Sequence, residues 1–248
     1  MKLKLASAVS LALLSANALA EEKKEDINYG DPTAVYKSVG VSVSNSNAVQ
    51  GNLIYGAGKN VVMADLTSQY KDAKKGDGSK GINYRARYFY VNDGLGASVD
   101  LIGTHNQNID STQAVAGLMY KMQITDNFMF FPMLNAGVQQ DKYKIPGSET
   151  YQTGIIQPAF FAMYAFDEGH WLYLNPRYTI ATNKREEVLE GDKFDAGTLQ
   201  IELGGGYMLN EWSALEVKVE HTVANKTVTL GQKQKDDTVG WLKYSIYF

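Results

Sequence analysis

Residues 82–90 read INYRARYFY, a run in which apolar and polar side chains alternate. Successive residues of a β-strand point to opposite faces of the sheet, so Tyr84 and Tyr88 share one face, and Arg85 and Arg87 share the other. The alternation recurs along the chain between clusters of turn residues, which predicts many strands. We place twelve of them at approximately 34–44, 48–56, 60–70, 82–92, 95–105, 111–124, 127–139, 151–166, 170–182, 197–209, 212–223 and 237–248.

The connections between these strands differ in length in a regular way. Every second connection is tight, for example near Gly58, Gly94 and Asn210, and those between are mostly long, for example 71–81 and 183–196. Short turns on one side of a membrane and longer loops on the other are typical of transmembrane barrels. We therefore predict an all-β fold, a transmembrane antiparallel up-and-down β-barrel of about twelve strands. Ten strands with an additional hairpin are the alternative.

The first twenty residues have the features of an export signal. Lys2 and Lys4 precede an apolar run over 5–14, and the small residues Ala18 and Ala20 precede a charged stretch. The run is too short for a permanent membrane helix, so we predict cleavage after Ala20. The chain then has three parts, a cleaved signal peptide (1–20), a short periplasmic N-terminal segment (21–33) and the barrel (34–248).

The last strand carries the most specific local motif. Leu242, Tyr244, Ile246 and the final residue Phe248 alternate on one face. In this respect the sequence resembles Gram-negative outer-membrane β-barrel proteins, whose last strand ends in an aromatic residue. The resemblance implies location in the cell outer membrane, contact with its lipid and lipopolysaccharide, and delivery by periplasmic chaperones. It also implies that the barrel-assembly machinery reads Tyr244, Ile246 and Phe248 as an assembly signal.

Length and strand count are similar to those of the small monomeric porins, a class that includes oligogalacturonate-specific channels with twelve strands. This resemblance covers the architecture of the barrel and no residue motif. It therefore implies a channel without naming a solute.

Three prolines lie inside predicted strands, namely Pro132, Pro158 and Pro176. Proline has no N–H to donate to a neighbouring strand, so each removes one bond of the ladder. We expect β-bulges at these positions, or a patch of weakened pairing across the seventh to ninth strands.

The face opposite the aliphatic one carries charges of both signs, which in a membrane barrel line the lumen. This pattern favours a narrow hydrophilic pore for passive diffusion of small hydrophilic solutes, with acidic and basic ladders facing each other. The alternative is that an ion-pair network plugs the lumen. The protein would then be a structural barrel, or a surface-interaction barrel whose outer loops act as an adhesin or receptor. The predicted pore-lining residues are Arg85, Arg87, Lys121, Arg177, Lys218, Asp65, Asp100, Glu202, Glu216 and Glu220.

Composition argues against other classes of function. The chain has no cysteine and a net charge of −3, so thiol chemistry and nucleic-acid binding are not expected. Its three histidines, His105, His170 and His221, lack the His-x-Ser pattern of barrel lipases, and we predict no catalytic residue. Acidic residues in 190–195 lack the spacing of a calcium loop, so neither a metal nor another cofactor is predicted.

Overall fold

The computed structural model describes residues 27–70, 80–92, 94–182, 197–223, 228–229, 232–233 and 236–248. The predicted signal peptide (1–20) and most of the longest predicted loops lie outside these ranges. Within them there is no helix long and apolar enough to cross a membrane. The strands are β1 (Lys37–Ser44), β2 (Ala48–Ala57), β3 (Asn60–Gln69), β4 (Gly81–Asn92), β5 (Leu95–Asn106), β6 (Ile109–Tyr120), β7 (Met122–Gln123), β8 (Phe128–Tyr143), β9 (Thr150–Ala165), β10 (Trp171–Ala181), β11 (Thr198–Asn210), β12 (Ser213–Val223), β13 (Val228–Thr229), β14 (Gln232–Lys233) and β15 (Asp237–Tyr247).

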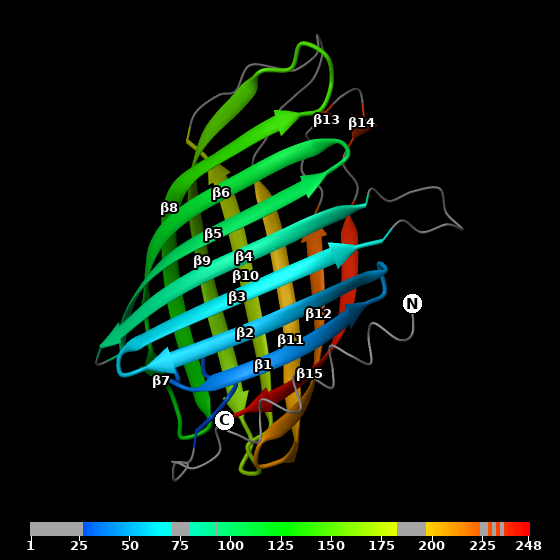
Figure 1. Cartoon of the computed structure of the whole chain (residues 1–248). Coiled ribbons are helices and arrows are strands. Elements are labelled where there is room, and N and C mark those ends of the chain that lie inside the picture. The colour runs from blue at the N-terminus through cyan, green and yellow to red at the C-terminus, as the bar shows by residue number, and fades with distance from the viewer. Residues whose placement is uncertain are drawn as a thin grey trace.

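Twelve long strands form one closed antiparallel barrel (Figure 1). Each strand pairs with its neighbours in the chain, and β1 pairs with the last strand, β15, so that Val41 lies opposite Tyr244. Pairing of β6 with β8 completes the ring, and β7 is a two-residue strand beside β8. The up-and-down barrel of twelve strands is confirmed, and the ten-strand arrangement is wrong.

The β8–β9 hairpin is longer than predicted. The strand expected at 127–139 continues to Tyr143, because Lys142 still pairs with Thr150. The inward side chain of Asp141 also has partners there, since it accepts hydrogen bonds from Ser111 and Gln139. A buried carboxylate that accepts hydrogen bonds from the neighbouring strand and from its own strand is compatible with continued strand structure.

Alternation separates the two faces of the barrel wall as predicted. The outer face exposes large apolar side chains, among them Leu66 (60% exposed) and Leu118 (59%). The inner face buries polar groups such as Ser42, Thr67 and Gln157. A soluble protein rarely exposes so continuous an apolar surface, so this outer face is suited to lipid.

The prolines do not produce bulges. Pairing of β8 with β9 keeps one register through Pro132 and Pro158. Pairing of β9 with β10 is interrupted beside Pro176, but Leu174 opposite Ala162 and Arg177 opposite Ala159 share one register. A bulge requires an inserted residue, whereas a proline only removes one donor. Among the described strand pairs, the register shifts in β11–β12, between Met208 and Asn210.

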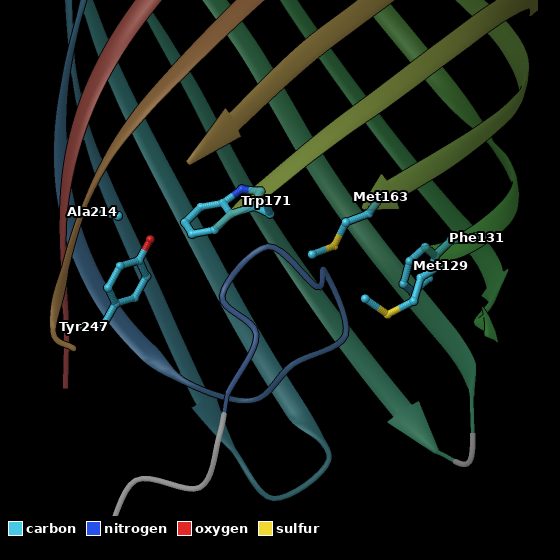
Figure 2. Packing of buried hydrophobic residues seen from close by; sticks show 6 residues of the cluster. All are labelled: Met129, Phe131, Met163, Trp171, Ala214 and Tyr247. Atoms are coloured by element: carbon cyan, nitrogen blue, oxygen red, sulfur yellow. The ribbon is translucent and has the colours of Figure 1, made fainter. Parts of the chain in front are cut away.

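One end of the barrel, which we call the short-turn end, carries the tight connections such as β4–β5 and β11–β12. Its interior is filled by apolar side chains in two clusters. The first, shown in Figure 2, comprises Met129, Phe131, Met163, Trp171, Ala214 and Tyr247. The second comprises Ile54, Val61, Phe89 and Met119.

The chain before β1 runs through this end of the barrel. Tyr29 and Tyr36 pack against the first cluster, and Val35 and Tyr36 pack against the second. Figure 2 shows this N-terminal stretch as a dark blue loop beside Trp171 and Met163. The predicted periplasmic segment (21–33) is thus described from residue 27 onward, and that part lies against the inner wall of the barrel.

Candidate functional site

A cavity of about 220 Å³ lies inside the barrel, next to the second apolar cluster, with which it shares Ile54. Most of the side chains that line it are charged or carry amide or hydroxyl groups. They come from opposite walls, because β4 and β11 are six strands apart in the ring of twelve. The lining residues are Ser42, Gln50, Asn52, Ile54, Met63, Asp65, Arg85, Arg87, Tyr173, Glu202, Gly205, Glu216, Val217, Lys218, Trp241 and Lys243.

The wall formed by β3, β4 and β5 carries an arginine pair. Arg87 lies opposite Asp100 in the β4–β5 ladder, and Arg85 lies two residues along on the same face. Both guanidinium groups bind the Asp100 carboxylate, with Nη2–Oδ2 distances of 2.6 Å for Arg85 and 2.5 Å for Arg87. Asp100 is only 4% exposed, so this one carboxylate holds both arginines while their cationic groups face the cavity.

Near this pair, Asp65 of β3 accepts a hydrogen bond of 2.6 Å from Asn52 Nδ2. Asn52 in turn donates to Gln50 and accepts from Ser42 on β1. These side chains continue the polar lining from the arginine pair around the barrel toward β15. Neutral amides between two charged walls provide both donors and acceptors for a polar solute.

The opposite wall, formed by β11, β12 and β15, carries the carboxylates. Glu216 accepts hydrogen bonds from Lys243 Nζ (3.2 Å), Ser245 Oγ (2.5 Å) and Tyr247 Oη (3.1 Å). Lys218 lies between two more carboxylates, with Nζ 2.8 Å from Glu220 and 3.6 Å from Glu202. Three carboxylates and two lysines leave this wall with an excess of one negative charge.

The predicted pore-lining residues fall into three groups. Asp65, Arg85, Arg87, Glu202, Glu216 and Lys218 line the cavity, so the structure brings the predicted basic and acidic walls together across it. Asp100 and Glu220 each contact a cation that lines it.

The remaining two have other partners. Arg177 donates to Gln200 (2.6 Å), and it has no carboxylate within 4 Å in the described part of the chain. Lys121 binds Asp31 of the N-terminal stretch, with an Nζ–Oδ2 distance of 2.5 Å. That these residues line a conducting pore stays a prediction.

Sequence reasoning missed two aromatic residues of the site. Trp241 lines the cavity and donates from Nε1 to Glu220 (2.9 Å), and Tyr173 lines it from β10. Aromatic side chains in a membrane barrel are ordinarily assigned to the lipid interface. Trp241 could have been predicted, because it is two residues from the inward Lys243 and therefore lies on the same face of the strand.

Each of the three histidines contacts a polar side chain within the described residues. His105 contacts Asp110, His170 contacts Glu168 and stacks on Tyr207, and His221 contacts Thr238. No group of three metal-ligating side chains occurs in the same ranges. The acidic residues of 190–195, considered above as a calcium site, lie outside the described part of the chain.

No protein-family model and no curated protein matches the chain. Solved structures do match. The NanC porin aligns with a TM-score of 0.55 at 9% identity, covering 85% of this chain and 98% of that one. An outer membrane channel from Pseudomonas putida F1 aligns at 0.53 and 14% identity, covering 92% and 100%. The KdgM porin aligns at 0.50 and 10% identity, covering 85% and 99%.

The chain has the fold of the outer-membrane porins and channels. Identities this low establish a shared fold and nothing about the solute. The charged residues of the cavity therefore have to be interpreted from their own geometry.

Proposed function

We propose that the chain is an outer-membrane channel for the passive diffusion of small hydrophilic solutes. The observation that carries this proposal is the cavity in the lumen, lined from opposite walls by charged and amide side chains. The wall around it has an apolar outer face, as a protein embedded in lipid requires. A barrel that served only as a scaffold would have no need of a polar cavity between two charged walls.

The charges suggest how solutes pass. Arg85 and Arg87 face the cavity on one side and the carboxylates Glu202 and Glu216 face it on the other, so charges of opposite sign meet across the lumen. Such an arrangement orients a polar or zwitterionic solute without strongly attracting or rejecting either sign of charge. The proposal therefore includes weak ion selectivity.

Single-channel recording of the purified chain in a planar bilayer tests this function. We expect stable conductance steps and, under a potassium chloride gradient, a reversal potential close to zero. A chain that is correctly folded, as shown by its heat-modifiable mobility on gels, but never gives a step even when residues 27–36 no longer fill the short-turn end contradicts the proposal.

The second candidate is a plugged structural or surface-interaction barrel. The packing of residues 27–36 in the short-turn end favours it, because that end is filled in the structure. Binding of the surface-exposed barrel to other cells or surface proteins, with no conductance, is its distinguishing result.

We also propose the route by which the chain reaches its membrane. Residues 1–20 act as the signal peptide, periplasmic chaperones carry the chain, and the barrel-assembly machinery reads Tyr244, Ile246 and Phe248. Tyr244 and Ile246 lie on the face of β15 opposite Lys243 and Ser245, and in the folded barrel Ile246 is buried, so we propose that the signal is read before the barrel closes. Removing Phe248 should lower the amount of barrel found in outer-membrane fractions. An unchanged amount contradicts the signal.

A further inference from the structure

We propose that residues 27–36, which we call the plug, close the periplasmic mouth of the channel, and that residues 27–34 must move for it to conduct. This inference rests on the proposed function and on the assignment of the short-turn end to the periplasm. It assigns a gating role to a stretch of chain that has no part in the strand pattern.

The plug contacts walls all around the barrel. Its residues Tyr29 and Tyr36 pack against the first apolar cluster, whose members come from β8, β9, β10, β12 and β15. Val35 and Tyr36 pack against the second, whose members come from β2, β3, β4 and β6. The ring of Tyr29 stacks on Tyr247 with 3.9 Å between centroids. The two clusters against which the plug packs draw their members from nine of the twelve strands, so little open cross-section is left at this end.

Gly30 is the point of closest approach. A Cβ atom placed on Gly30 would lie 2.4 Å from Cγ of Trp171 and 2.7 Å from Cε of Met163. The plug therefore sits against the first cluster only because residue 30 has no side chain. Figure 2 shows the loop passing Trp171 and Met163 at this place.

Asp31 fixes the plug to the wall by charge. Its carboxylate is 6% exposed and binds Lys121 at the end of β6, 90 residues away in the chain. The other oxygen, Oδ1, accepts hydrogen bonds from the backbone N–H and the hydroxyl of Thr33. The pair also compensates the charge of Lys121, which an empty mouth would present to solutes without a partner.

The hydrogen bonding of the plug allows it to leave without disturbing the barrel. In the described structure its backbone bonds run within the plug, from Asp31 N–H to Asn28 and from Ala34 N–H to Asp31. The first bond to a strand is at Tyr36, whose carbonyl accepts from Gly56. Release of residues 27–34 about a hinge at Val35 and Tyr36 thus breaks side-chain contacts and no strand pairing.

A bridged cysteine pair tests the position and the role of the plug separately. The chain has no cysteine of its own, so Asp31→Cys combined with Lys121→Cys can be joined by a short dithiol-reactive reagent that a reductant reverses. We expect bridging of most molecules by intact mass, loss of conductance on bridging, and its return on reduction. The single Asp31→Cys variant is the control, and its conductance should not respond to the reagent and reductant in this way.

Two further variants weaken the contacts between the plug and the barrel wall without any cysteine bridge. Gly30→Ala should raise the ratio of open to closed time roughly tenfold or more, since the side chain cannot be accommodated at the wall. The matched control is Gly51→Ala, whose added Cβ meets nothing within 4 Å. Asp31→Asn, which keeps the oxygen that Thr33 uses, should act in the same direction and should also add anion preference by exposing Lys121.

The outcomes separate the two proposals. If the cysteines bridge but conductance is the same bridged and reduced, the plug does not gate the channel. If they do not bridge in the folded barrel, the plug does not lie at Lys121. If every form, including Gly30→Ala, is folded and silent although the cysteines bridge, the channel function itself fails while the placement of the plug stands.

Discussion

Asp100 is a buried carboxylate that forms salt bridges with two arginines at once. It supplies the only negative charge within salt-bridge distance of Arg85 and Arg87 in the described structure. We expect Asp100→Asn to leave two neighbouring cations without compensation and to lower the free energy of unfolding by about 1–3 kcal/mol, since both arginines keep some contact with water. Urea unfolding in detergent, followed by gel mobility, measures this change. Asp126→Asn in an exposed turn is the control, and equal stability of the two variants would contradict the prediction.

Parity along a strand predicts where a single side chain points but not what it meets. The inward direction of Arg85 and Glu216 followed from the sequence, whereas their partners depend on register and on which strands face each other. The contact between Asp31 and Lys121 could not be predicted, because residues 27–36 have no alternation and their partners come from strands spread over the whole chain.

At the scale of the elements, strand positions were largely predictable because each strand has its own alternation and its own turn residues. The β15 strand, predicted at 237–248, is found at Asp237–Tyr247. The bulges expected at the prolines were wrong, since a missing donor changes bonding and leaves the residue count of a strand pair unchanged.

The interrupted pairing of β9 with β10 has a measurable consequence. Pro158 and Pro176 lie in adjacent strands, and the recorded pairs between them stop at Leu174 and resume at Arg177. We expect the amide hydrogens of β10 around Arg177 to exchange faster than those in the middle of β12, whose pairing with β15 is continuous. Hydrogen–deuterium exchange with mass spectrometry compares the two. Equal protection would show that the gap has no effect on local stability.

At the scale of the whole molecule, the lumen around the cavity is balanced in charge. Five carboxylates, Asp65, Asp100, Glu202, Glu216 and Glu220, accompany five cations, Arg85, Arg87, Arg177, Lys218 and Lys243. Neutralising one wall at a time should therefore shift selectivity in opposite directions. Arg85→Gln with Arg87→Gln should favour cations, and Glu202→Gln with Glu216→Gln should favour anions.

Reversal potentials under a salt gradient measure these shifts, ideally in the Gly30→Ala background if the native chain opens rarely. The shifts should shrink at high salt, because mobile ions screen charges that face water. Shifts of the same sign for both double variants, or none for either, would show that the cavity is not on the path of the ions.

Because β1 pairs with β15, the barrel can close only in a chain that has been synthesised through its last strand. A chain that ends before β15 has no partner for β1 or for β12, and both strands then keep rows of unpaired N–H and C=O groups that lipid cannot solvate. Insertion is therefore favourable only for a chain translated to its last strand. We therefore expect prematurely terminated copies to remain in the aqueous compartment instead of entering the membrane.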